Sequence, residues 1–431
     1  MISVGLVFVA VAGISFLGFT INALFGRIRI TNIVPLMLIG ILIGPVFGLV
    51  NVGSTGIVSQ LTPFVTAIAI AFILFDVGLN LNIDSINKTA VKGNAFAFGT
   101  QIIMALAITA VSYFIFGWNL IVALILGFAL SSSSTPAVQA IVRVVKVPDQ
   151  IKTVIIYESV VTDALALIVP LLLINMLAGT GITYSSGFFM AFTIIVGAVV
   201  LGAASALFWL VILTRFSKQS KGYMWMLTLT MLIATYGISS ILELNTAITI
   251  FVFGITFATL GTLKEKLPNR DWLVKHFTFT VNMRYIRNYQ REITFFTSTF
   301  FFVYIGMLFS FSDFSGAAAD IYLVLYAAAA TLVALVVRYL MAPVLSEYMN
   351  KDRDKRSVDR GTVIFSVGRG LSPAVIATLP ITMGIVIPNF LDAIFLVILF
   401  SNIVSAVGVF FETRKSEGFQ TTLRRTARIN G

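Results

Sequence analysis

Long apolar segments, separated by short polar stretches, follow one another along almost the whole chain. Most of them run for about 20 residues, which is the length that an α-helix needs to cross a hydrocarbon layer of roughly 30 Å. The pattern therefore predicts an all-α polytopic membrane protein with thirteen transmembrane helices and no separate soluble domain. The predicted spans are residues 2–25, 33–50, 62–80, 94–117, 119–144, 151–177, 187–213, 223–241, 246–262, 291–311, 320–346, 359–386 and 389–413.

The Lys and Arg residues alternate with these spans. They occupy every loop that follows an odd-numbered span and the C-terminal tail, whereas the loops after even-numbered spans contain none. Because basic residues favour cytoplasmic loops, we expect a plasma-membrane protein with its N-terminus outside and its C-terminus in the cytoplasm. The net charge of +11 then faces anionic lipid of the inner leaflet and requires no nucleic-acid partner.

Composition narrows the function classes. Hydrophobic residues make up 58% of the chain and charged residues 11%, whereas a soluble domain has about half and a quarter. The chain has no cysteine, which excludes disulfides, thiol catalysis and Cys-held metals, and its single histidine, His276, excludes an HExxH metalloprotease site. We therefore expect a transporter rather than an enzyme, with no cofactor.

A few charged residues lie within the predicted spans. Away from the span ends, the acids are Asp76, Glu158 and Asp163, and the only bases are Arg338 and Arg369. A charge near the bilayer centre costs at least about 2.5 to 3.5 kcal/mol on insertion scales, so each one needs a partner or a function. Asp163 lies about 18 Å into the sixth span at 1.5 Å per residue, close to the midplane.

Two of the predicted spans are interrupted. Span five contains ALSSSSTPAV at residues 129–138, where hydroxyl groups compete for backbone hydrogen bonds and Pro136 cannot donate one. Span twelve contains VGRGLSPAV at residues 367–375, with two glycines around Arg369 followed by Pro373. Broken segments at matching positions of two inverted halves indicate the midplane site of a transporter. Spans 1–6 and 8–13 are therefore predicted to form the two repeats, with span seven as the connector.

Four motifs carry a family resemblance: ESVVTDA from residue 158, SSTPA from residue 133, VGRG from residue 367 and LFDVGLNLNI from residue 74. Together and in this order they resemble the cation:proton antiporter superfamily, and within it the archaeal and bacterial sodium/proton antiporters of the NhaP type. The resemblance implies an NhaA-like antiporter fold, with two inverted six-helix repeats and two crossed broken helices.

The resemblance also implies an ion site. Asp163 would hold the cation and the proton in turn, and Ser159 would supply a coordinating hydroxyl, so that sodium binds at these two residues. Ser134, through its main chain, and Thr135 would contribute from the first broken helix. Independently of the family, residues four apart share a helix face, which places Ser159 beneath Asp163. Oxygen ligands of this kind suit a small hard cation.

Residues beside this ion site affect the charge carried in each exchange. The resemblance implies that Glu158 coordinates through water and forms a structural ion pair with Arg369. Thr162, which stacks over Glu158, stands where the electroneutral branch has Asn and the electrogenic branch has a second Asp. Thr135 stands where many members have Asp. With Glu158 neutralised, a single titrating acid predicts electroneutral exchange.

A domain plan and a homodimer are further implications of the resemblance. Helices 1–3 and 8–10 would form the dimer interface, while helices 4–6 and 11–13 would form a core domain that carries the site. The implied parts are residues 1–93 and 223–312 (dimerisation), 94–180 and 313–413 (core), 181–222 (linker helix) and 414–431 (short basic cytoplasmic tail).

The sequence thus favours a secondary transporter that exchanges sodium, or lithium, for a proton by alternating access and so serves pH homeostasis. Burial disfavours an ionised carboxylate and a bound cation favours it, so the two ions would compete for Asp163. A potassium/proton antiporter remains an alternative, because ALSSSSTPAV also resembles that branch. An ion-coupled symporter of a small organic anion is a more remote one. A channel would need a continuous pore, usually with repeats arranged around its axis.

Overall fold

The computed structural model describes residues 4–28, 32–48, 57–80, 88–135, 137–138, 141, 149–178, 184–215, 223–261, 283–309, 317–349 and 356–429. Within these ranges the chain is helical and contains no strand. The predicted cytoplasmic loops at 142–148, 216–222, 262–282 and 350–355, including His276, lie outside the described residues.

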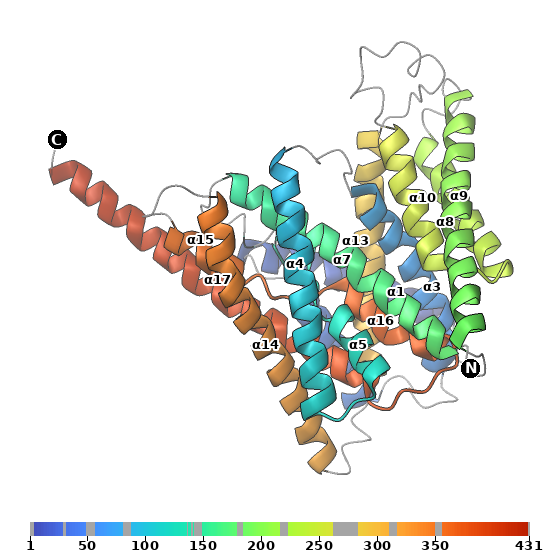
Figure 1. The fold of residues 1–431 in the computed structure, drawn as a ribbon, viewed down its shortest axis with the longest axis horizontal. Helices are drawn as coiled ribbons and strands as arrows, with labels where there is room; N and C mark the ends of the chain where they lie inside the picture. Colours follow the sequence, from blue (N-terminus) through green and yellow to red (C-terminus); the bar gives the residue numbers. More distant parts are fainter. Residues whose placement is uncertain are drawn as a thin grey trace. The chain divides into compact units, whose positions relative to one another are not determined.

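The helices fall where the apolar segments predicted them (Figure 1). Among the described residues, seven helices are long and apolar enough to cross a membrane by length and composition, and five shorter apolar helices accompany them. The count of thirteen spans stays a prediction. In chain order the elements are α1 (Val4–Ile28), α2 (Ile33–Ile41), η1 (Leu42–Val46), α3 (Ile57–Asn80), α4 (Lys88–Ala110), η3 (Val111–Ile115), α5 (Leu120–Ala129), α7 (Asp149–Ala178), α8 (Tyr184–Arg215), α9 (Met224–Ile241), α10 (Thr246–Gly261), α13 (Met283–Leu308), α14 (Ala317–Met349), α15 (Arg356–Ile364), α16 (Leu371–Thr382) and α17 (Phe390–Ile429).

Two helices extend furthest beyond their predicted spans. α13 begins at Met283 rather than at residue 291, and α17 continues to Ile429 rather than ending at 413. Neither extension contains proline, so nothing in the backbone stops the helix where the apolar segment ends. Hydrophobicity marks the part of a helix that suits lipid, whereas the helix itself ends where its hydrogen-bonding pattern is broken.

The chain divides into two compact units. Unit 1 consists of Met1–Thr62, Lys88–Leu173 and Phe302–Gly431, and unit 2 consists of Pro63–Asn87 and Ile174–Phe301. The predicted core helices, with α7 as far as Leu173, all belong to unit 1, together with α1 and α2. The division into core and dimerisation domains stays a prediction.

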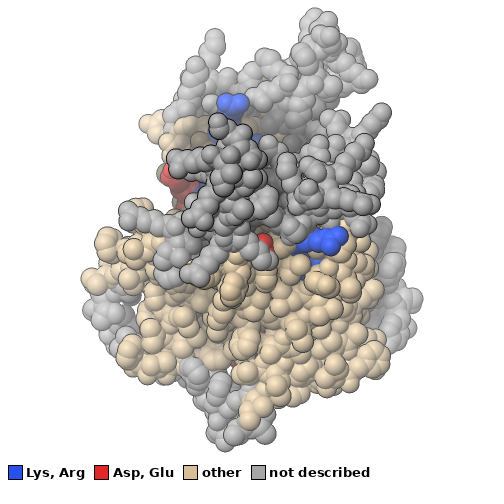
Figure 2. Space-filling model, turned by 90° about the vertical axis from the view of Figure 1, so that its left-hand side faces the viewer, with Lys and Arg blue, Asp and Glu red and all other residues tan. Residues whose placement is uncertain are grey.

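The surface keeps large apolar side chains exposed. Phe114 is 79% exposed and Phe8 is 71% exposed, and on the face drawn in Figure 2 a broad area carries almost no charged side chains. Apolar patches of this extent mark a surface that faces something other than water, and in a chain of repeated apolar helices that environment is the lipid bilayer.

Both predicted interruptions are present, and both lie in unit 1. α5 ends at Ala129, and the chain becomes helical again only at Thr135; α15 ends at Ile364, and α16 begins at Leu371. We call residues 130–134 the first break and residues 365–370 the second break. The amide of Ser134 donates to the carbonyl of Gly368 at 2.8 Å, so the two breaks cross in contact with each other.

Glycine makes this close crossing possible. A Cβ atom on Gly370 would lie 2.6 Å from Oγ of Ser134 and 2.9 Å from its Cβ, and a Cβ on Gly368 would lie 3.0 Å from Cβ of Ala137. Any side chain at Gly370 would therefore push the breaks apart. The two glycines of VGRG are explained by this lack of space for a side chain, because neither has the positive φ that would demand glycine.

Helix α17 supplies hydrogen-bond partners to the second break. Oγ of Ser401 accepts from the amide of Arg369 at 3.2 Å, and Nδ2 of Asn402 donates to the carbonyl of the same residue at 2.7 Å. Oγ of Ser405 donates to the carbonyl of Phe365 at 2.9 Å. Backbone groups at membrane depth need partners within the protein, and these polar residues in the apolar part of α17 provide them.

Helix α14 is fixed against its neighbours in unit 1 at both ends. It packs beside α4, α15 and α17 (Figure 1). Tyr326 near its start is fully buried, 3.0 Å from Oγ of Ser112 and in edge contact with the ring of Phe116. Ala342 near its end belongs to a buried apolar cluster that includes Val154 of α7. These contacts hold the middle of α14 opposite α7.

Candidate functional site

The predicted acids lie on α7, which runs unbroken from Asp149 to Ala178. Glu158 and Ser159 are fully buried, Thr162 is 1% exposed and Asp163 is 8% exposed. A continuous helix through this region keeps the four-residue spacing that places Ser159 and Asp163 on one face. Two carboxylates are thus buried within five residues of each other.

Asp163 lies between the two broken helices. Oγ1 of Thr135 donates to its Oδ2 at 2.9 Å, and the Thr135 amide reaches the same oxygen at 3.4 Å. Oγ of Ser372, in the first turn of α16, donates to its Oδ1 at 3.2 Å. Among the described residues, no Lys or Arg forms an ion pair with this carboxylate.

Glu158 is paired with an arginine of α14. Nη2 of Arg338 lies 2.7 Å from Oε1 of Glu158, and Nη1 donates to Oε2 at 2.8 Å. Both side chains are 1% exposed, and the same guanidinium also donates to Oγ of Ser133 in the first break. One hydrogen bond and a second close contact between opposite charges thus neutralise this buried carboxylate.

The expectation that Arg369 pairs with Glu158 is therefore corrected: the partner is Arg338. Arg369 is fully buried, and its Nη1 donates to the carbonyls of Ser131 and Ser132 in the first break. These carbonyls follow the C-terminal end of α5, where the carbonyls lack an N–H donor within the helix and a positive charge is favoured. Arg369 stabilises the crossing of the breaks, and Arg338 neutralises the acid.

Ser159, Thr162 and the hydroxyl of Ser134 form no hydrogen bond with Asp163 within the described part of the chain. Ser159 donates its hydroxyl proton to the carbonyl of Ile156 at 2.8 Å, and Thr162 donates to the carbonyl of Ser159 at 3.2 Å. Oγ of Ser134 is buried without a hydrogen-bond partner among the described residues. A hydroxyl whose proton is already donated keeps its oxygen lone pairs available for a cation.

Two buried polar side chains beside the site had not been predicted from the sequence. Ser372 contacts Asp163 directly, and its signal was its place directly before Pro373 in the interrupted stretch. Gln101 on α4 is 1% exposed and donates to Oγ of Ser131 at 2.6 Å. A single amide in an apolar span was the only sign of Gln101, and it gives no indication of which break the side chain contacts.

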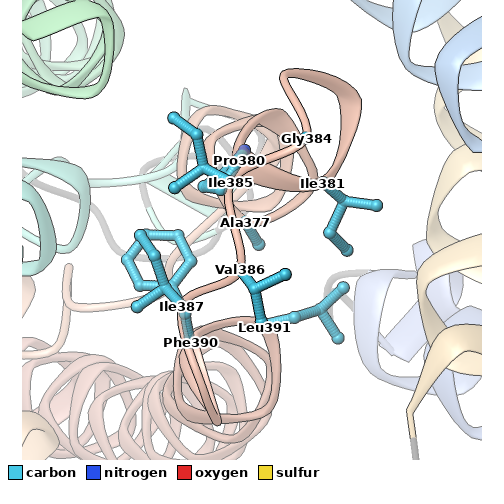
Figure 3. A pocket seen from close by; sticks show the side chains of 9 residues that line it. All are labelled: Ala377, Pro380, Ile381, Gly384, Ile385, Val386, Ile387, Phe390 and Leu391. Carbon is cyan, nitrogen blue, oxygen red and sulfur yellow. The ribbon is translucent and has the colours of Figure 1, made fainter. Parts of the chain in front are cut away.

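An apolar pocket in unit 1 is separate from this site. It has a volume of about 200 Å³ and lies where α16 ends and α17 begins, at the end of α16 opposite Ser372 (Figure 3). It contains no ionisable side chain, so it is not the ion site. Its lining residues are Ala377, Pro380, Ile381, Gly384, Ile385, Val386, Ile387, Phe390 and Leu391.

Comparisons with known proteins agree with this architecture. The family model described as "Sodium/hydrogen exchanger, transmembrane" matches residues 12–414. The chain is similar in structure to the sodium proton antiporter MjNhaP1 from Methanocaldococcus jannaschii at pH 8, with a TM-score of 0.69, 16% identity, and coverage of 94% of this chain and 98% of that one. An electron-microscopy structure of the same antiporter gives a TM-score of 0.67, 14% identity, and coverage of 96% and 98%. No curated protein sequence matches the chain.

The chain is a membrane transporter rather than an enzyme. It has this antiporter fold, and its two broken helices cross beside a buried acid. The chain belongs to the sodium/hydrogen exchanger family. It is thus a multi-pass membrane protein of the cation/proton antiporter class.

Replacing Arg338 tests the observed pairing. Arg338→Met leaves the Glu158 charge buried and unpaired, and we expect a loss of about 3 to 5 kcal/mol in unfolding free energy. Adding Glu158→Gln removes the unpaired charge and should restore much of the stability. The measurement is denaturant unfolding of the purified protein in detergent.

The matched control is the pair Arg369→Met and Arg369→Met with Glu158→Gln. Since Arg369 contacts carbonyls of the first break, removing the Glu158 charge should give little recovery there. Rescue of the Arg369 variant, without rescue of the Arg338 variant, would contradict the pairing seen in the structure.

Proposed function

We propose that this protein exchanges a monovalent cation, sodium in the first place and lithium as a second substrate, for a proton across the cell membrane. The proposal rests on a difference between two neighbouring acids: one has an ionic partner and the other does not. Glu158 is neutralised by Arg338 at 2.7 Å, whereas Asp163 is surrounded by hydroxyl donors and has no ionic partner among the described residues. A buried carboxylate without a cationic neighbour is stabilised by taking up a proton or a cation.

Exchange follows if the two ions compete for Asp163. The proton neutralises the carboxylate directly, and the cation neutralises it by binding to its oxygens, so occupancy by one excludes the other. The empty, charged site crosses the barrier poorly because of its desolvation cost. Each change of the site from one membrane face to the other then carries either a cation or a proton. When a core domain moves against a scaffold in this way, a cation crosses in one direction and a proton in the other.

The proposed cation ligands are oxygen atoms that lie near Asp163. Ser159 is four residues away on the same helix face, and Thr135 contacts the carboxylate. The main chain of Ser134 and the hydroxyl of Thr162 complete the proposed set, with Glu158 acting through a bound water. Carboxylate, hydroxyl and carbonyl oxygens are the ligands preferred by hard cations.

The remaining features of the proposal come from the sequence. The alternation of basic loops supports the orientation with the N-terminus outside and the inner face against anionic lipid. The homodimer, its interface on helices 1–3 and 8–10, the plasma-membrane location and a role in pH homeostasis rest on the family resemblance.

The first test is collapse of an imposed pH gradient in proteoliposomes on addition of sodium, lithium or potassium. We expect a sodium-dependent collapse that Asp163→Asn reduces to the level of empty liposomes, because the amide can neither take up a proton nor neutralise a cation. Asp392→Asn, a matched change in the first turn of α17, should keep the activity.

Each outcome discriminates between substrates. A response to potassium alone would move the protein to the potassium/proton branch with the same site. Full activity of Asp163→Asn would show that the site is wrong and would direct attention to the symport of an organic anion.

The exchange should be electroneutral. A second acid at position 162 would allow a second charge to be carried, but this position is Thr162. Glu158 is paired with Arg338. A single carboxylate therefore exchanges one cation for one proton. Sodium-driven proton movement should therefore be independent of membrane potential in voltage-clamped liposomes. A transport current that reverses with membrane potential would refute this stoichiometry.

A further inference from the structure

The carboxylate of Asp163 is held symmetrically. Its Oδ2 receives a hydroxyl hydrogen bond from Thr135, at the end of the first break, and its Oδ1 receives one from Ser372, just after the second break. Each broken helix thus contributes one hydroxyl, and each hydroxyl occupies a different oxygen of the same acid.

The sequence shows that the two hydroxyls are counterparts. The first broken span reads TPAV at residues 135–138, and the second reads SPAV at residues 372–375. Hydroxyl, proline, alanine and valine follow in the same order, in spans that occupy corresponding positions of the two predicted inverted halves. Ser372 therefore stands in the second half where Thr135 stands in the first.

We propose that Ser372 is a ligand of the transported cation, so that the cation at Asp163 is held by one hydroxyl from each broken helix. The inference rests on the proposed function, in which Asp163 binds the cation, and adds to it a ligand from the second half of the chain. The binding site then spans both repeats.

The distances suit such a role. Oxygen ligands lie about 2.3 to 2.6 Å from calcium, whose radius is close to that of sodium, so ligands at right angles lie about 3.3 to 3.7 Å apart. The hydroxyl oxygens of Thr135 and Ser372 lie 2.9 Å and 3.2 Å from the carboxylate oxygens. Each hydroxyl therefore lies slightly closer to its carboxylate oxygen than two ligands of one cation would, and a small outward movement gives the spacing of a shared ligand pair. Ser372 is 2% exposed, so bulk water does not replace it.

The same hydroxyls would stabilise the site both when it is empty and when it holds a cation. A serine or threonine hydroxyl has one proton to donate and two lone pairs to offer. In the empty site both protons point to Asp163 and stabilise its negative charge, together with the N-terminal end of α16. When a cation arrives, both hydroxyls turn their lone pairs towards it. The bound cation then links the two broken helices, which favours their movement as one body.

Removing the hydroxyl of Ser372 tests the proposal. We expect Ser372→Ala to raise the sodium KM of exchange about tenfold, as for the loss of one strong polar contact, with little change in maximal rate. The sodium concentration needed to raise the melting temperature of the detergent-purified protein by a given amount should rise in parallel. The second readout reports binding without transport.

Controls separate this effect from damage to α16. Thr378→Val removes another buried hydroxyl of the same helix, one that donates to the carbonyl of Val375, and should keep the wild-type KM. Ser372→Gly is a second hydroxyl-free variant, to be used if Ser372→Ala does not fold, and the same rise is expected of it.

A folded hydroxyl-free variant with a sodium KM within about twofold of wild type would overturn the inference, since that corresponds to less than half of one typical hydrogen bond. Measuring Asp163→Asn alongside distinguishes a failure of the ligand assignment from a failure of the proposed function. If it is inactive while Ser372→Ala is normal, the exchange function stands and only the ligand assignment fails. If it is fully active, the proposed function itself fails.

Discussion

The rest of the structure depends on one constraint: a helix broken inside a membrane must find partners for its exposed backbone groups within the protein. Here the two breaks meet this need largely through each other. The Ser134 amide bonds to the Gly368 carbonyl, Arg369 donates to carbonyls of the first break, and α17 supplies Asn402 to the second. The crossing requires glycine at 370, where a side chain would collide with Ser134. The crossing brings the two helix ends together beside Asp163.

Charge is distributed around this crossing so that one acid remains available. The Glu158–Arg338 pair is buried and is joined by a hydrogen bond and an ion contact, while Arg369 donates to backbone carbonyls. Asp163 receives only hydroxyl and amide hydrogen bonds within the described part of the chain. Neutral donors stabilise an ionised carboxylate less than an arginine does, so this acid keeps a strong affinity for a proton or a cation. An exchanger needs a carboxylate of this kind.

The sequence predicted features that depend on local chemistry. The breaks followed from Pro, Gly and Ser runs, and the common helix face of Ser159 and Asp163 followed from the helical period, because both are properties of a single segment. It could not predict which arginine reaches Glu158, since Arg338 and Arg369 are both buried bases and only the packing of α14 against α7 decides between them. Ser372, Gln101 and the polar residues of α17 were missed for the same reason. Their roles arise from contacts between segments far apart in the chain.

The central claim is that cation and proton compete for Asp163, and proton release on cation binding tests it most directly. Sodium would be added to the purified protein in weakly buffered detergent solution across the acidic range, and bound sodium and released protons would both be counted. The account predicts about one proton released per sodium bound where the site is protonated, and no release from Asp163→Asn. Sodium binding that releases no proton at any pH, or release that persists in the variant, would contradict it.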